Sequence, residues 1–129
     1  VPDIVKATLD SICLQTYELV ECMEKDATVK LLEIRVDGGM AYNNNFIQSL
    51  SNITQIKIIK PFNLETTSLG AAYLAAIQSG IIKNTKQIEN MWKEKKTFSP
   101  KLNKNKITKK IKIWKEAIKL LIKFDLKRI

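Results

Sequence analysis

The sequence contains no histidine, the side chain that most often serves as a metal ligand or a general base near neutral pH. Without it there is no Ser-His-Asp triad, no Cys-His pair and no zinc site of the usual kinds. The two cysteines, Cys13 and Cys22, are nine residues apart. On one helix their Cα atoms would be about 13 Å apart, whereas a disulfide needs less than about 7 Å. We therefore expect two free thiols, no metal site and none of the enzyme classes that need these groups.

Glycine, proline and long apolar runs are also scarce. Four glycines and three prolines leave no low-complexity linker. The longest uninterrupted apolar run is 71–77, far short of the roughly 20 residues that span a bilayer. The first residues carry neither a basic segment nor a long apolar core, so no secretory signal is visible. These absences predict a soluble, cytoplasmic protein without a transmembrane segment.

The 129 residues that are present have an ordinary globular composition, with 45% hydrophobic and 27% charged residues. Their charge is divided unevenly. Residues 1–81 carry six basic and nine acidic groups, whereas residues 82–129 carry sixteen basic and four acidic groups. We therefore divide the chain into an N-terminal segment, residues 1–81, and a lysine-rich C-terminal extension, residues 82–129.

A basic region of this density can bind nucleic acid or an anionic membrane surface. Here the lysines are spread out, arginine is nearly absent and no series of aromatic residues accompanies them. We favour a solvated helix face and expect no nucleic-acid partner, while keeping a lysine-rich nucleic-acid-binding module as an alternative.

Hydrophobic spacing predicts a helix from Ile4 to about Met23, with Asp3 as its N-cap. Its apolar residues recur at spacings of three and four, and an acidic run follows the outer face. The apolar face comprises Val5, Leu9, Ile12, Thr16, Leu19 and Met23, and the acidic run comprises Glu18, Glu21 and Glu24. A helix that begins so early, with no preceding layer to pack on, suggests a chain cut from something longer.

The rest of the chain alternates between strand and helix patterns. We expect a strand over 30–36, a short helix over 43–53 and a second strand over 56–59 that is stopped by Lys60-Pro61. A helix over 64–79 follows and ends at Gly80, and the chain over 82–103 is expected to be irregular and anchored by Trp92 and Phe98. The last helix covers 104–126, with an apolar stripe of Ile107, Ile111, Trp114, Ile118 and Leu121. This order predicts an α/β fold. Two strands make a poor sheet, so the chain is expected to supply only a portion of one.

The segment that most clearly indicates a functional site is residues 34–41 (Ile-Arg-Val-Asp-Gly-Gly-Met-Ala). A strand ends at two glycines and a helix follows. Glycine accepts unusual backbone angles and lets a flat ligand lie against the main chain, and the start of a helix suits a phosphate. Asn43 is placed to hydrogen-bond a nucleotide edge or ribose. An ordinary strand-to-helix turn remains the alternative, because the Walker A and dinucleotide patterns are both missing.

The pattern apolar-x-apolar-x-Gly-Gly-x-Ala resembles the adenosine motif of the actin-like, sugar-kinase and Hsp70 ATPase superfamily. Within it, 35–39 followed by Asn43-Asn44, and 65–75 with its Glu-Thr-Thr start, look like the glycerol kinases of the FGGY carbohydrate kinase family. Other FGGY kinases tend to carry Glu-Gly-Ala at that start. Further similar segments are 5–9, 12–16, 97–101 and 114–117. The resemblance extends from about residue 2 to residue 119.

This resemblance implies a partial ribonuclease H-like (actin-like ATPase) domain from an enzyme that transfers the γ-phosphoryl group of ATP to glycerol, with Mg²⁺ as a further cofactor. ATP or ADP and glycerol would be its ligands, and a homo-oligomer is one option. In the family, the catalytic aspartate and the phosphate loops lie upstream of the segment present here. The resemblance therefore implies a C-terminal fragment with no catalytic residue and no metal ligand, inactive alone. A fragment of another FGGY sugar kinase and a decayed remnant stay open.

Carried over residue by residue, the resemblance gives two groups of site residues. Those expected to contact the nucleotide are Gly38, Gly39 and Asn43, and those expected to support the pocket are Asp37, Asn44, Thr66, Thr67 and Gly70. We also expect the apolar face of the first helix and at least one strand edge to lack partners, which predicts poor solubility or oligomers.

Overall fold

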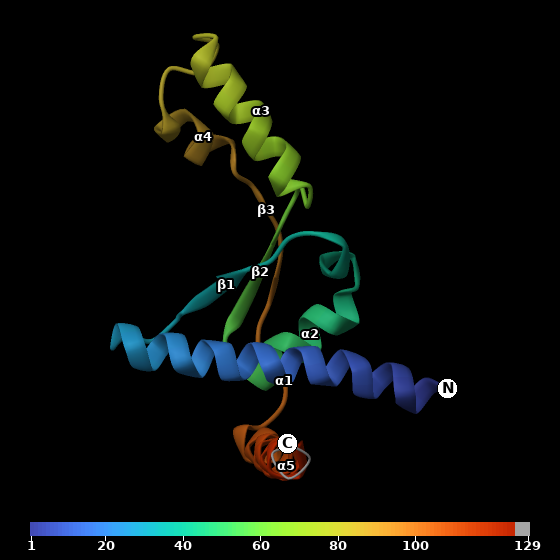
Figure 1. The fold of residues 1–129 in the computed structure, drawn as a ribbon. Helices are drawn as coiled ribbons and strands as arrows, with labels where there is room; N and C mark the ends of the chain where they lie inside the picture. Colours follow the sequence, from blue (N-terminus) through green and yellow to red (C-terminus); the bar gives the residue numbers. More distant parts are fainter. Residues whose placement is uncertain (126–129) are drawn as a thin grey trace.

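The computed structural model describes residues 1–125 and shows a mixed α/β fold built on a three-stranded sheet, in the order β1-β2-β3. β1 (Glu33–Arg35) runs parallel to β2 (Lys57–Pro61), with Ile34 opposite Ile58. β2 runs antiparallel to β3 (Glu94–Phe98), with Ile58 opposite Phe98. α1 (Pro2–Ala27) crosses one end of this sheet, and α3 (Thr66–Gln78) with α4 (Thr85–Met91) extends from the other end (Figure 1).

The core lies between α1, α2 (Asn44–Thr54) and the sheet. Ile47, Ile58 and Cys13 are almost fully enclosed and join the three elements. The whole cluster comprises Cys13, Leu14, Ala41, Phe46, Ile47, Leu50, Ile53, Ile58, Leu64, Phe98 and Ile107. Both cysteines are free thiols, and burial raises the pKa of the Cys13 thiol to about 11, so this thiol stays protonated at neutral pH.

α1 carries apolar residues on two adjoining faces. Cys13, Leu14 and Val20 form the face that is buried by contact with α2. On the face predicted from the sequence, Val5, Leu19 and Met23 are more than half exposed and only Leu9 packs against the core, so this face largely lacks partners, as expected. Asp3 lies in the first turn, and Val1 is the N-cap.

Strand β2 extends through the two residues that were expected to stop it. Lys60 and Pro61 both pair with β3, and the register shifts between them. Proline has no N–H to donate, so the ladder accommodates it through this irregularity. The prediction that Lys60-Pro61 ends the strand was therefore wrong.

The segment 82–103 is more regular than expected, because it contains α4 and β3. Only Phe98 of β3 is buried; the other four residues of the strand are exposed. β3 therefore lacks the alternation that marks a strand in sequence, and its pairing with β2 determines its conformation. Phe98 is an anchor as predicted, whereas Trp92 is 37% exposed and stacks on the Arg35 guanidinium at 4.3 Å.

Two helices make few contacts with the core. α3 has no buried residue, even though it is rich in alanine and leucine. α5 (Lys104–Asp125) lies beyond α1 in Figure 1, and Ile107 fixes it to the core. The expected helix end at residue 126 lies outside the described residues. Across residues 1–125, no helix combines the length and the hydropathy needed to cross a bilayer.

Candidate functional site

The diglycine turn follows directly from the end of β1. The Val36 N–H donates to the Ile59 carbonyl (3.1 Å), which continues the pairing with β2 by one residue. Gly38 then adopts φ 76° and ψ −175°, a backbone conformation that essentially only glycine occupies. Its N–H donates to the Leu64 carbonyl (3.0 Å). The turn is therefore fixed between the end of β1 and the start of α3.

Gly39 opens the short 3₁₀ helix η1 (Gly39–Tyr42) and has a different environment from Gly38. The Ala41 N–H donates to the Gly38 carbonyl (3.0 Å) and closes this turn. Gly39 is exposed, and a Cβ added there would meet no atom within 4 Å. Neither an unusual φ angle nor crowding within the chain requires glycine at this position. The bare backbone at Gly39 is thus free for a ligand to approach.

Asn43 caps α2. Its Oδ1 accepts hydrogen bonds from the N–H groups of Asn45 (3.0 Å) and Phe46 (3.1 Å). This capping role occupies the carbonyl oxygen that would otherwise accept from a nucleotide. The exposed Nδ2 group is the portion of this side chain that remains able to donate to a ligand.

The residues expected to support the pocket divide into those that are joined to the turn and those that are not. The Thr66 hydroxyl donates to the Asp37 carboxylate and ties the first turn of α3 to the glycine turn. Gly70 lies one helical turn farther along α3, with open space around it. Thr67 is exposed, and its hydroxyl makes no hydrogen bond with the described residues. The structure thus brings Asp37, Gly38 and Thr66 together and leaves Thr67 apart.

Lys60 is a member of this region that sequence reasoning missed. It is only 6% exposed, and its Nζ donates to Asn44 Oδ1 (3.2 Å) at the start of α2. Among the described residues no carboxylate lies within 4 Å of its ammonium group, and the start of a helix disfavours a nearby positive charge. The sequence feature that could have identified Lys60 is its position two residues after Ile58, which places both side chains on the same face of the strand.

The described residues contain no complete set of ligands for a magnesium ion. Over residues 1–125 there is no group of three or more histidine, cysteine, aspartate or glutamate side chains that could hold a metal ion. Asp37 lies at the turn, but its carboxylate accepts from Thr66. The described residues therefore do not by themselves supply the ligands of a magnesium ion.

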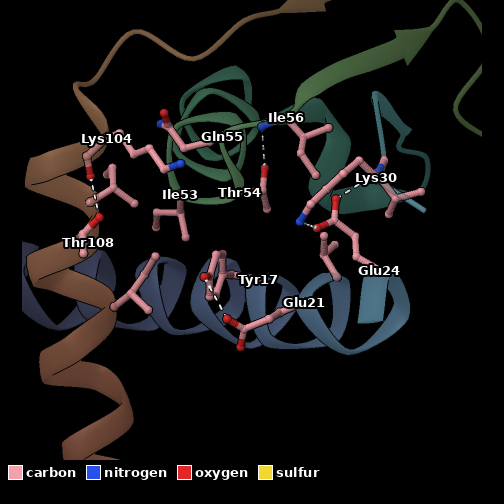
Figure 2. Close-up of a pocket in the computed structure, with 14 residues that line it drawn as sticks. Tyr17, Glu21, Glu24, Lys30, Ile53, Thr54, Gln55, Ile56, Lys104 and Thr108 are labelled. Carbon is pink, nitrogen blue, oxygen red and sulfur yellow. Dashed lines mark hydrogen bonds and ion pairs between the residues drawn. The ribbon is translucent and has the colours of Figure 1, made fainter. Parts of the chain in front are cut away.

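A pocket of about 360 Å³ lies elsewhere, between α1, the end of α2 and α5 (Figure 2). Its two glutamates and Lys30 are paired, whereas the Lys104 ammonium forms no ion pair with the described residues. Glu24 accepts from Lys30 (2.5 Å), and Glu21 accepts from Tyr17 (3.1 Å) and from Lys115 (2.5 Å). These bonds hold the pKa values of both glutamates below their ordinary value. The pocket lies beneath α5 and is distinct from the glycine turn.

The geometry of the turn and its neighbouring elements has counterparts among known proteins. The model of the C-terminal domain of the FGGY family of carbohydrate kinases matches residues 1–79. The chain belongs to this family. The match covers the glycine turn, α2, β2 and α3 completely. The fold of the chain, which is a portion of an actin-like ATPase fold, agrees with this family membership.

Individual relatives share much of this chain but are far longer. The FGGY chain is 45% identical over 115 residues to the probable glycerol kinase of Dictyostelium discoideum, covering 89% of this chain and 21% of that protein. It is 43% identical over 116 residues to the glycerol kinase of Dichelobacter nodosus, covering 90% and 23%. The chain therefore spans about a fifth to a quarter of the length of these relatives.

Solved kinase structures match a similar share of this chain, and this chain again covers about a quarter of each of them. The glycerol kinase of Plasmodium falciparum with ADP matches with a TM-score of 0.77 and 33% identity, over 90% of this chain and 23% of that one. The xylulose kinase of Lactobacillus acidophilus matches with a TM-score of 0.78 at 21% identity, over 94% and 25%, and this likeness shows the fold alone.

Proposed function

We propose that this chain is the C-terminal portion of an ATP-dependent glycerol kinase and contributes the adenosine side of its nucleotide pocket. The observation that carries the proposal is the open backbone at Gly39, next to a turn that Gly38 fixes and α3 holds in place. The relatives named glycerol kinase, one of them solved with ADP, support this choice of nucleotide and substrate.

In this proposal each residue of the turn has a separate task. Gly39 lets the flat face of the nucleotide lie on the main chain, and Asn43 Nδ2 donates to its polar edge. Gly38, with the bond between Asp37 and Thr66, holds that surface in position, while Asn44 and Gly70 lie behind it. ATP supplies the γ-phosphoryl group for transfer to glycerol.

The catalytic base and the magnesium ligands are expected in the rest of the enzyme. Phosphoryl transfer needs both, together with loops that hold the phosphates, and the described residues provide no acidic cluster. We infer that the 129-residue chain alone does not phosphorylate glycerol. We also infer that residues 82–129 form an extension beyond the nucleotide-binding segment, residues 1–81, and that the enzyme works in the cytoplasm.

A chimeric kinase tests this proposal. The matching C-terminal segment of the Plasmodium falciparum glycerol kinase is replaced by this chain, and glycerol 3-phosphate formation is measured against ATP concentration. We expect an active enzyme in which Gly39→Val raises the KM for ATP at least tenfold and leaves the KM for glycerol unchanged. Lys86→Val, an equally exposed position on α4, is the matched control and is expected to change neither constant.

Two outcomes distinguish a failure of the proposed nucleotide site from a failure of the proposed substrate. A Gly39→Val chimera with an unchanged KM for ATP would overturn the nucleotide site. A chimera that accepts another polyol or sugar in preference to glycerol would instead assign the chain to a different FGGY kinase.

A further inference from the structure

α5 has one side fixed against the protein body. Ile107 is buried, and Ile111 and Trp114 pack against the core. Two ion pairs with α1 flank this inner side, Lys110 to Asp10 at 2.6 Å and Lys115 to Glu21 at 2.5 Å. Together they fix the rotation of the helix about its own axis and thereby determine which residues face away from the body.

A second apolar row lies on the outer side. Ile113 is 59% exposed and Leu120 is 69% exposed, and these two residues, seven apart, lie on the same side of the helix. The outer side of a surface helix is normally polar. This outer row, defined as Ile113 and Leu120, is therefore apolar where a solvated helix would carry charge.

Exposed lysines run alongside the outer row. Lys112 and Lys119 are seven residues apart and Lys123 follows one turn later, so the three form a parallel row next to the apolar one, which Glu116 interrupts and which keeps a net positive charge. In total α5 carries eight lysines against one glutamate and one aspartate. An apolar row beside a lysine row is the pattern of helices that lie in the interface of an anionic membrane.

We propose that the outer side of α5 binds an anionic lipid surface. The outer row enters the boundary between headgroups and acyl chains, and the lysine row pairs with lipid phosphates and carboxylates. A second copy of the chain would bring lysine rows close together, and a nucleic acid would leave the apolar row unpaired. The lipid surface is the partner that satisfies both rows. α5 lies outside the region matched by the family model, residues 1–79.

Vesicle flotation with the full chain tests this inference. The probes are vesicles of phosphatidylcholine alone and of phosphatidylcholine mixed with phosphatidylserine. We expect binding to the mixed vesicles that weakens with added salt. Ile113→Ser/Leu120→Ser should reduce binding at least tenfold, and Lys112→Glu/Lys119→Glu at least thirtyfold. The control Lys83→Glu/Lys86→Glu changes net charge equally at exposed sites outside α5 and should change binding less than threefold. Circular dichroism confirms that each variant retains its helices.

Equal binding to both kinds of vesicle, or an equal loss of binding in the Lys83→Glu/Lys86→Glu control, would overturn the inference. So would lipid-free oligomers that Ile113→Ser/Leu120→Ser dissociates, or binding to a DNA duplex that this apolar variant leaves unchanged. The chimeric kinase is assayed in the same way. If the free chain binds mixed vesicles and the active chimera does not, the rest of the enzyme covers the outer row and the inference fails, while the glycerol kinase proposal stands.

Discussion

Gly38 and Gly39 are adjacent, but they are glycines for different reasons. Gly38 has a backbone conformation that other residues reach only with strain, whereas Gly39 has ordinary backbone angles and open space where a side chain would lie. The first requirement belongs to the fold of the chain. The second is unexplained by the fold and is what the proposed nucleotide site would require.

Alanine substitutions separate these two requirements. We expect Gly38→Ala to lower the free energy of unfolding by about 1–3 kcal/mol because of backbone strain. Gly39→Ala should change it by less than about 0.5 kcal/mol, as an exposed substitution without strain does. Urea denaturation of the two variants measures the difference. Equal destabilisation by both would show that Gly39 serves the fold and would remove the main support for the nucleotide site.

Lys60 gives a second prediction at this scale. Its buried ammonium has two neutral partners, Asn44 Oδ1 and the Tyr42 ring 5.9 Å away, and among the described residues no carboxylate lies within 4 Å. Burying an uncompensated charge is costly, and methionine has a similar length without the charge. We expect Lys60→Met to raise the free energy of unfolding of the chain by about 1 kcal/mol.

Thermal and urea unfolding measure the effect, with Lys57→Met, a more exposed position on the same strand, as the control. A loss of stability in Lys60→Met that exceeds the loss in Lys57→Met would show that the bond to Asn44 outweighs the cost of burial.

The elements differ in how far their sequences determine them. The start of α2 was predictable because Asn43 bonds to the N–H groups of residues two and three positions ahead, a purely local interaction. β3 was not, because its exposed polar residues become a strand only through pairing with β2. The buried face of α1 also depends on a partner distant in sequence. Local chemistry therefore predicted the glycine turn and its cap, and tertiary contact determined the rest.

The contact between α5 and α1 is expected to depend on pH. The hydrogen bond from Lys115 lowers the pKa of Glu21; burial raises the pKa of Asp10, but the bonds from Lys110 and Lys6 outweigh burial and lower it overall. A carboxylate with a lowered pKa stabilises the folded state above its unfolded pKa, and this contribution is lost as the pH falls through the folded pKa. The ordinary values are 4.5 for Glu21 and 3.8 for Asp10, so we expect α5 to loosen as the pH falls below about 4.5.

Trp114 fluorescence, in a Trp92→Phe background, measures this loosening because Trp114 packs between α5 and the core. In the Asp10→Asn/Glu21→Gln variant the pH transition should largely disappear. A transition of the same size in that variant would show that other groups control the contact.

At the scale of the whole molecule, much apolar surface has no partner among the described residues. Leu74 on α3 is 71% exposed and Ile4 on α1 is 71% exposed. The comparisons agree, since the chain spans about a fifth to a quarter of its relatives. In the proposed enzyme the remaining length would supply covering surfaces, and a homo-oligomer is one further way to bury them.

We therefore expect the isolated chain to form oligomers or aggregates, because large exposed apolar patches drive association. Size-exclusion chromatography with light scattering measures this. Leu74→Lys should increase the monomer fraction, whereas Lys86→Glu, at an exposed polar position, should not. A monomer that unfolds cooperatively without either substitution would contradict the view that these faces need partners.

The most direct test of the nucleotide site follows the glycine turn itself during nucleotide binding. This chain, labelled with ¹⁵N, is mixed with the unlabelled N-terminal portion of a glycerol kinase relative, and ADP is added while amide signals are recorded. We predict that the amides of Gly38, Gly39 and Asn43 shift with rising ADP, and that Gly39→Val abolishes the shift. Unmoved amides at this turn in an assembled complex that binds ADP would contradict the central claim.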